Sequence, residues 1–480
     1  MYAGCFVVLF RLGESEPYIG RDACHFSDYN GVVIPPNIAP LNFALNDQDA
    51  GSCAVFSFGG QQFEVKGEKG GFVIPPSKWK KLLESATGNS IQVTVQVKQG
   101  NEWVAYSPFT IQVAAEKIDS YLAYRLIDPG YELWNKMGIY QRDLESYTQT
   151  PIIENKMSGN NCVNCHSFCM QNPDKMLFHM RETFPGTILV DGDKIEKLNT
   201  KTRETISSLV YPSWHPSGKY VAFSVNTTKQ AFHLNDKNRV EVYDEASDVV
   251  VYDVEKHEIV TASTIFSKDA FETFPTFSPD GKTLYFCTAE ARPIPQEYSE
   301  VKYNLCSISF DPATRTFGTQ VDTLYNAKSG GMSASFPRVS PDGRYLLYTL
   351  SGYGNFSIWH KDADLYMTDL QIGTSRPLAE VNSDDVESYH SWSSNSRWFV
   401  FSSRRIDGLY TRPYIAYVGE DGKVGKPFLL PQKDVGFYPS FMKSFNIPEF
   451  ITGKVKVQGR ALAIKAKEIR GPMSGLQNNS

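Results

Sequence analysis

One sequence pattern recurs along the second half of the chain and constrains the fold more than any other feature. Each copy reads as a strand, a tight turn and a second strand. Four complete copies and one shortened copy are present, at residues 211–223, 274–286, 336–348, 389–401 and 438–441. Their starts lie 63, 62, 53 and 49 residues apart, and self-similarity at a period of this size is typical of repeat architectures. We therefore expect several copies of one supersecondary unit.

The turn within the copies explains why strands flank it. Two copies carry Pro-Asp-Gly there: proline fixes φ, aspartate hydrogen-bonds to the nearby backbone, and glycine permits a positive φ. Further strand-forming runs, such as 249–254 and 358–370, lie between the copies. Four strands in about 50 residues is the size of one β-propeller blade. The chain also holds 26 Tyr, 30 Phe, 35 Gly and 27 Pro, a composition that favours strands and turns, so we expect an all-β chain.

The turn sequence also points to a family. Residues 278–281 and 340–343 read Ser-Pro-Asp-Gly. In this tetrapeptide the repeat resembles the TolB-like family of β-propellers, whose blades carry it at the first turn. The resemblance extends over residues 162–450 and implies a six-bladed propeller. It implies little about function, because one fold serves many activities.

A sixth copy is expected at the start of this region. Residues 172–179 align with 215–223 except for the turn glycine, and 165–168 align with 389–392. The last blade has few residues after position 441, so we expect it to borrow a strand from the other end of the propeller.

The segment before the repeats predicts a smaller β-domain. Residues 91–97 alternate strictly between apolar and polar side chains, as in a half-buried strand. A short helix is expected at 78–85 with Ser77 as its N-cap, and another at 118–126. The predicted organisation is an N-terminal segment at 1–39, a small β-sandwich-like domain at 40–115, a linker with the second helix at 116–160, the six-bladed propeller at 161–450, and a closing strand with a flexible basic tail at 451–480.

Residues 162–166 read Cys-Val-Asn-Cys-His, the attachment signature of a c-type haem. In this hypothesis Cys162 and Cys165 form thioethers to the vinyl groups of one covalent haem c, and His166 is the proximal iron ligand. The alternative is a reduced or disulfide-bonded cysteine pair beside an ordinary histidine. The alignment places the motif at the start of the first blade, on the strand that runs along the central channel.

Electron transfer by such a haem requires a second axial ligand, which is normally His or Met. His179 is a candidate because the alignment gives it the inward position that a large aromatic residue holds in the other copies. His390 shares the alignment position of His166 and faces the channel from another blade. The full set of candidates is His179, Met170, Met176, Met180 and His390. Each of them is otherwise an ordinary core or surface residue, and an open sixth position would instead suit ligand sensing or peroxide chemistry.

Three arginines near the repeat strands are candidate partners of the haem propionates, because a guanidinium group matches the geometry of a carboxylate. They are Arg338, Arg404 and Arg405. The alternative for each is an ordinary surface arginine.

The net charge and the N-terminal sequence bear on the binding partners and the cellular location of the chain. The net charge of −5 implies no general affinity for nucleic acid. No stretch of the sequence is apolar for long enough to span a bilayer. Ala3-Gly4-Cys5 is similar to the end of a bacterial lipoprotein cleavage box, which makes Cys5 a candidate lipid anchor, although Cys5 is otherwise an ordinary cysteine. Since c-type haem attachment requires an oxidising compartment, we expect a bacterial periplasm or outer-surface envelope.

Two functions are consistent with these patterns. The first is an extracytoplasmic haem c propeller that transfers electrons or senses redox state with a redox or envelope protein partner. The alternative is a haem-free envelope scaffold that binds a protein or a glycan. A third candidate is a glycan-active enzyme, which would need paired carboxylates at a fixed spacing, and the sequence shows no such pair. The sequence also contains no Gly-x-Ser-x-Gly, phosphate-loop or His-Glu-x-x-His motif. Whether the chain is an enzyme stays open, and the patterns favour a protein that is not one.

Overall fold

The computed structural model describes residues 18–22, 25–26, 28–45, 51–128, 136–198, 200, 205, 207–468 and 476–478. The chain divides into two compact units. The small unit holds 1–36, 40–115 and 431–438, and the larger unit holds 37–39, 116–430 and 439–480. Both are built mainly from antiparallel sheets, which confirms the all-β prediction. Among the described residues, no helix combines the length and the apolar character needed to cross a membrane.

The small unit contains two sheets and one helix. One sheet is formed by β1 (Tyr18–Asp22), β3 (Val33–Ile34), β5 (Ser52–Phe58), β6 (Gln61–Lys66), β8 (Ser90–Gln99), β9 (Glu102–Ser107) and β10 (Phe109–Val113), and the other by β2 (His25–Phe26), β4 (Phe43–Leu45) and β7 (Gly71–Phe72). The buried residues of β8 alternate as predicted. Because β1 and β3 belong to the first sheet, this domain begins before residue 40. Helix α1 (Pro76–Ala86) starts after Pro75, and Ser77 lies inside it rather than capping it.

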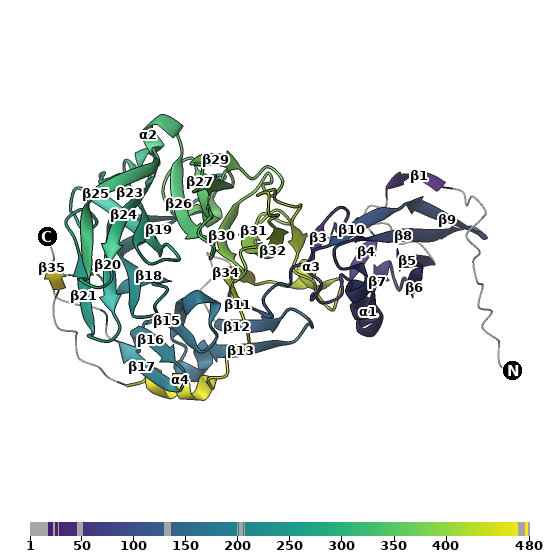
Figure 1. Cartoon of the computed structure of the whole chain (residues 1–480), viewed down its shortest axis with the longest axis horizontal. Helices are drawn as coiled ribbons and strands as arrows, with labels where there is room; N and C mark the ends of the chain where they lie inside the picture. Colours follow the sequence, from purple (N-terminus) through teal and green to yellow (C-terminus); the bar gives the residue numbers. More distant parts are fainter. Residues whose placement is uncertain are drawn as a thin grey trace. The chain divides into compact units, whose positions relative to one another are not determined.

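The larger unit contains six blades of a β-propeller in its described residues (Figure 1): five sheets have four strands, and one has a short fifth strand at its outer edge. We name each blade by its inner strand. The strands of each blade are given from the inside outward. The first three blades are the β14 blade, with β14 (Cys162–Phe168), β15 (Lys175–Arg181), β16 (Gly186–Asp191) and β17 (Lys194–Leu198); the β18 blade, with β18 (Leu209–Trp214), β19 (Tyr220–Phe232), β20 (Val240–Asp253) and β21 (Glu258–Thr261); and the β22 blade, with β22 (Ala270–Phe277), β23 (Thr283–Glu290), β24 (Asn304–Asp311) and β25 (Thr316–Tyr325). The other three are the β26 blade, with β26 (Ser333–Val339), β27 (Tyr345–Ser351), β28 (Asp364–Asp369) and β29 (Thr374–Pro377); the β30 blade, with β30 (Glu387–Trp392), β31 (Trp398–Ser403), β32 (Arg412–Tyr417) and β33 (Phe428–Leu429); and the β34 blade, with β34 (Ser444–Ile451), β11 (Tyr121–Ile127), β12 (Gly138–Asp143) and β13 (Gln149–Glu154). A short strand, β35 (Leu476–Asn478), extends the β18 blade beyond β21.

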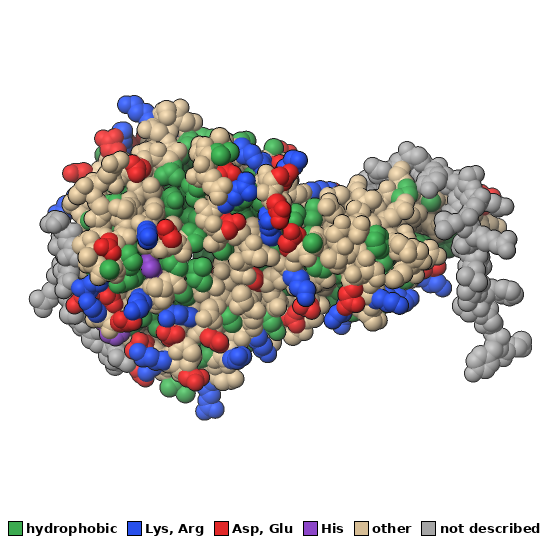
Figure 2. All heavy atoms as spheres, viewed as in Figure 1, with side chains coloured by type: hydrophobic (Ala, Val, Ile, Leu, Met, Phe, Trp, Pro, Cys, Tyr) green, Lys and Arg blue, Asp and Glu red, His purple; other side chains and the backbone are tan. Residues whose placement is uncertain are grey.

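The inner strands close a ring. Each inner strand contacts the inner strand of the next blade, and β34 contacts β14. The Ser-Pro-Asp-Gly turns between first and second strands have the predicted form: Ser278 Oγ donates to Asp280 Oδ1 at 2.5 Å, and Gly281 has a φ of +72°. In the face shown in Figure 2, hydrophobic side chains gather toward the middle of this unit, and charged side chains lie mainly around them.

The β34 blade corrects two predictions about the ends of the propeller. Residues 121–127 form strand β11, which pairs with β34, so the predicted linker with a helix at 118–126 is wrong. A short apolar run fits a helix or a buried strand equally well, and the pairing decides. The closing strand is β34, which ends at residue 451 rather than following it, and residues 459–466 of the predicted tail form helix α4 (Gly459–Ala466).

All six inner strands share one β-bulge at the same position. The pairing register shifts by one residue there, and the first bulged residue has a φ between +47° and +52°. These residues are Cys165, Tyr211, Phe274, Phe336, Tyr389 and Ile447. The shortened copy at 438–441 is therefore not the last repeat: it overlaps helix α3 (Phe437–Ser440), and the true sixth copy is 447–450. Such bulges re-aim side chains and are features of function or of sheet edges.

Candidate functional site

Side chains of the six bulges fill the middle of the central channel. The ring centroids of Phe274 and Phe336 lie 4.0 Å apart, those of Tyr211 and Phe274 4.7 Å, and those of Phe336 and Tyr389 4.8 Å. Together with Cys165 and Ile447 these four rings are called the channel plug here. Inner-strand residues that follow a bulge line one cavity, and in the β14, β18 and β34 blades those that precede a bulge line another.

The first cavity, which we call the histidine cavity, has a volume of about 140 Å³. Each blade contributes the residue two positions after its bulge, and this column is polar throughout: Ser167, Ser213, Thr276, Arg338, Ser391 and Glu449. Trp214 and Trp392 also line the cavity. Their indole N–H groups donate to the carbonyl oxygens of Ser167 at 3.2 Å and of Arg338 at 3.0 Å, so the polar atoms of both rings are satisfied by neighbouring blades.

His166 and His390 lie in this cavity, each with only 3% of its surface exposed. None of their four ring nitrogens makes a hydrogen bond of normal geometry to a described residue. Burial lowers the pKa of each imidazole to about 3; Arg125 adds to the decrease for His166, and Arg338 adds to it for His390. Nearby backbone groups, of Ile447 for His166 and of Leu347 and Phe336 for His390, only partly oppose the decrease. Both rings are therefore neutral near pH 7, and each can donate one hydrogen bond and accept another.

A carboxyl group and a guanidinium group share the same cavity. Burial raises the pKa of Glu449 to about 8, although the Phe168 N–H, 3.0 Å from Oε1, and Arg338 oppose the increase. Burial also lowers the pKa of Arg338, and Glu449 opposes that decrease. Glu449 is mostly protonated at neutral pH, so the cavity offers hydrogen-bond donors and acceptors with one fixed positive charge.

The structure brings together some of the predicted site residues. Cys165, His166, Met170 and His390 all line the histidine cavity. Cys162 lines neither of the two channel cavities. The described cysteines, Cys53, Cys162, Cys165, Cys169, Cys287 and Cys306, are all free thiols. Cys5, the predicted lipid anchor, lies outside the described residues.

The expectation that His179 replaces an inward aromatic residue is wrong. Phe168 pairs with Met176 in the same way that Trp214 pairs with Val221, so Phe178 takes the aromatic position. Matching His179 to Phe223 was wrong by one residue, because the turn between β14 and β15 is irregular. His179 lies in neither channel cavity, and its Nδ1 is 3.2 Å from Thr187 Oγ1. The other two methionine candidates, Met176 and Met180, are buried in the core.

These positions do not fit a porphyrin held by both cysteines and His166. Cys162 does not reach the cavity that His166 faces. That cavity is about as large as one that holds a single benzene ring, and it is smaller than the roughly 300–1,000 Å³ of ordinary small-molecule pockets. The motif also lies in an extended strand, where the bulge at Cys165 turns the chain.

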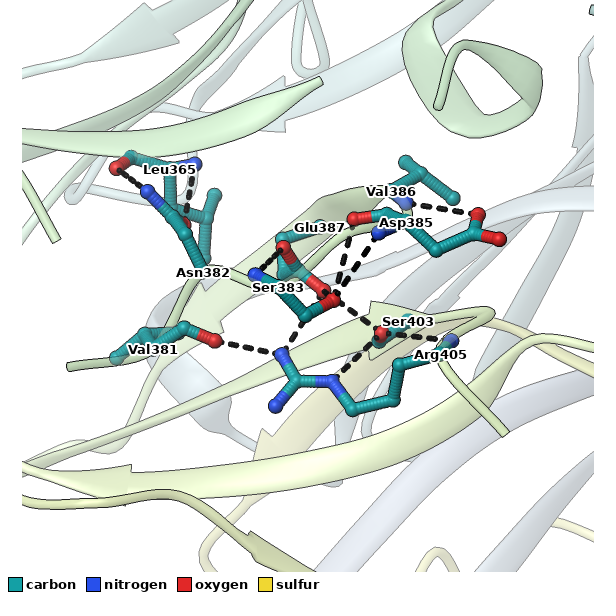
Figure 3. Close-up of polar contacts among 9 residues, drawn as sticks. All are labelled: Leu365, Val381, Asn382, Ser383, Asp385, Val386, Glu387, Ser403 and Arg405. Carbon is teal, nitrogen blue, oxygen red and sulfur yellow. Dashed lines mark hydrogen bonds and ion pairs between the residues drawn. The ribbon is translucent and has the colours of Figure 1, made fainter. Parts of the chain in front are cut away.

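The three candidate propionate partners have separate positions. Arg338 lines the histidine cavity and Arg404 lines the cavity beyond the plug. Arg405 forms an ion pair of 2.8 Å with the fully buried Glu387, and its Nε is 3.0 Å from Ser403 Oγ (Figure 3). Ser383 Oγ also donates to Glu387, at 2.7 Å. Arg405 is therefore occupied in a network that fixes the start of the β30 blade.

Glu449 is a site residue that the sequence pattern did not predict. The reason is the misplaced sixth copy: once 447–450 is aligned with 336–339, Glu449 falls in the same column as Arg338. Arg125 and Arg181, which line the cavity beyond the plug, were not predicted either, because they lie on second strands outside the repeated sequence pattern.

No known family profile and no curated protein matches this sequence. Solved structures with a similar fold include the dipeptidyl peptidase 4 of Porphyromonas gingivalis (12% identity, 67% of this chain and 53% of that one, TM-score 0.31). They also include an ancestral GH74 enzyme (12% identity, 87% and 47%, TM-score 0.37) and a PL25 ulvan lyase (8% identity, 85% and 96%, TM-score 0.34). The chain spans just over half the length of the peptidase. These likenesses are too weak to indicate a function.

Proposed function

We propose that this chain is a haem-free binding protein whose propeller takes a small, hydroxyl-bearing ring, such as the terminal unit of a glycan, into the histidine cavity. The observation that carries the proposal is the set of four buried ring nitrogens on His166 and His390, none of which makes a hydrogen bond of normal geometry to a described residue. Backbone carbonyl groups approach the rings, that of Ile447 near His166 and those of Phe336 and Leu347 near His390, without satisfying them in that geometry. A buried polar group left unpaired costs about 1–3 kcal/mol, so these nitrogens favour a ligand that hydrogen-bonds to them.

The other walls of the cavity agree with such a ligand. Its volume of about 140 Å³ matches one six-membered ring. The neutral imidazoles and the protonated Glu449 each donate and accept, as hydroxyl groups do. Among the described residues, Glu449 is the one carboxyl group that lines the cavity, whereas glycoside hydrolysis normally uses two. We therefore propose binding rather than hydrolysis.

Glycan-array screening followed by calorimetry tests the binding proposal. For a glycan that binds the wild-type protein, His166→Ala and His390→Ala should each weaken the affinity about tenfold, because each removes hydrogen bonds from a desolvated site. His233→Ala is the matched control, since His233 is exposed and lines neither channel cavity. Unchanged affinity in both cavity variants, or no binding across the array, would contradict the proposal.

Haem attachment is tested separately. The chain is expressed with haem-maturation machinery, together with a control cytochrome, and the denatured protein is examined by its pyridine haemochrome spectrum. We expect no covalent haem, because Cys162 and His166 do not face one cavity. A haem absorbance that disappears in the double variant Cys162→Ser/Cys165→Ser would overturn the haem-free proposal and restore the electron-transfer hypothesis.

The proposed place of action is the bacterial envelope. This proposal rests on the TolB-like turn sequence and on Ala3-Gly4-Cys5, and cell fractionation with mass analysis of the N-terminal peptide tests it.

A further inference from the structure

A second cavity lies on the opposite side of the channel plug from the histidine cavity. We call it the arginine cavity; its volume is about 410 Å³. Inner-strand residues before the bulges line it, among them Asn164, Val210, Ser444 and Asn446. The long hairpin of β19 and β20 adds further lining residues from outside the inner strands. The volume is within the range of ordinary small-molecule sites.

Arg404 is the most deeply buried charge of this cavity. It is 4% exposed, and its Cζ lies 3.2 Å from the ring centroid of Trp359. Its Nε donates to the Ile358 carbonyl at 2.8 Å, and Nη1 donates to the Leu409 carbonyl. Within the described residues, no carboxylate forms an ion pair with it. Burial lowers the pKa of Arg404 to about 9, although Asp385, Tyr389 and Asp407 oppose the decrease from a distance. Buried charges are normally paired directly.

Two more arginines line the same cavity without a carboxylate partner in the described part of the chain. Arg125 donates from Nη2 to Asn446 Oδ1 at 2.7 Å and from Nη1 to Asn164 Oδ1, and its Nε is buried without a partner. Arg181 is exposed at the end of β15. The neutral amide groups hold Arg125 in place but leave its charge uncompensated.

The acid and the lysine at the cavity wall are already engaged. Asp128 accepts a hydrogen bond of 2.6 Å from Lys443. Lys229 forms an ion pair of 2.5 Å with Glu245. The cavity therefore carries three guanidinium groups in excess over carboxylates from the described residues.

From this arrangement we propose that the arginine cavity is an anion-binding site for a small molecule that joins an oxyanion, a carboxylate or a phosphate, to an aromatic or apolar body. Guanidinium groups bind such oxyanions through paired, charge-assisted hydrogen bonds. The apolar part of the ligand would contact the aromatic side chains of the wall: Tyr211, Phe356, Trp359 and Tyr389. This site is independent of the proposed function, because the channel plug separates the two cavities.

Calorimetry with benzoate, phenyl phosphate and benzamide tests the site on the full chain. Benzamide has nearly the shape of benzoate but no charge. We expect both anions to bind, benzamide to bind at least about tenfold more weakly, and the affinity for the anions to fall as salt screens the charges. Equal binding of benzoate and benzamide, or no binding of either anion, would overturn the proposal. The two anions distinguish carboxylate from phosphate as the preferred group.

Variants locate the binding. Arg181→Met should weaken anion binding about tenfold without affecting the fold, because the side chain is exposed, and Arg404→Met should do so while keeping an apolar stem over Trp359. Near-UV circular dichroism shows whether Arg404→Met folds; if it does not, Arg181→Met decides alone. Arg292→Met, at an exposed ion pair outside the lining of both channel cavities, is the matched control. Wild-type affinity in Arg181→Met would overturn the proposal, and so would loss of anion binding in His166→Ala, whereas failure of glycan binding would leave this site unaffected.

Discussion

At the scale of single residues, the larger unit buries carboxyl groups whose protonation affects stability. Asp244, 4% exposed, accepts hydrogen bonds from Asn226 at 2.8 Å and from Asn355 at 2.6 Å. These bonds join the β19–β20 hairpin to the loop after β27. Burial raises the pKa of Asp244 to about 7, and the two amides only partly oppose it. The same hairpin provides part of the wall of the arginine cavity.

The direction of this pKa shift predicts a pH dependence. The unfolded chain loses the Asp244 proton near pH 4 and the folded chain near pH 7, so the stabilising contribution is complete below about pH 4 and is lost as the pH rises through 7. Asp244→Asn mimics the protonated form. It should therefore reduce the fall in unfolding free energy between pH 5 and pH 8, by on the order of 1–3 kcal/mol.

Urea unfolding across that pH range measures the effect. The exposed Asp322, changed to Asn, is the control and should leave the slope unchanged. A variant at Asp244 with the wild-type pH slope would show that this carboxyl group is ionised in the folded protein.

At the scale of elements, the inner strands store conformational strain at their bulges. A non-glycine residue with a φ near +50° costs about 1–2 kcal/mol, and each of the six inner strands holds one. Cys165 is the position at which this strain energy is best measured, because its side chain is small and replacing it removes few atoms. Cys165→Gly should be more stable than Cys165→Ala by about 1 kcal/mol, since only glycine adopts this conformation without strain.

The control pair is Ser167→Gly and Ser167→Ala, two residues along the same strand and past the bulge. There the order should reverse, because glycine weakens a regular strand by roughly 0.5–1 kcal/mol. Chemical denaturation of the four variants at 25 °C gives the comparison. If Cys165→Gly is less stable than Cys165→Ala, the bulge is not strained.

The same strands show which parts of the fold were predictable from sequence. Turns such as 278–281 were predictable because Pro, Asp and Gly act locally on the backbone. The β34 blade was not, because its outer strands at 121–154 lack the Ser-Pro-Asp-Gly turn and its inner strand pairs across more than 300 residues. His179 was misplaced for a related reason: an irregular turn shifts period-two alternation by one residue and so reverses the face of every side chain after it.

At the scale of the whole molecule, closure of the ring brings together site residues that no linear sequence motif indicates. The histidine cavity joins His166, Arg338 and Glu449, which come from three blades. His166 and His390 hold equivalent positions in the sequence repeat, and both line this cavity. The exclusion of Cys162 was not predictable from the motif, because the bulge that separates Cys162 from His166 depends on pairing with β15.

The pairing of β11 with β34 has a consequence for synthesis. The two strands are more than 300 residues apart, so at about 5–20 residues per second the ribosome delivers β34 roughly 15 to 65 seconds after β11. Until then, the inner edge of β11 presents unpaired N–H and C=O groups, which attract other strands. Pairing of β11 with β34 therefore removes an exposed strand edge that would otherwise favour aggregation during synthesis.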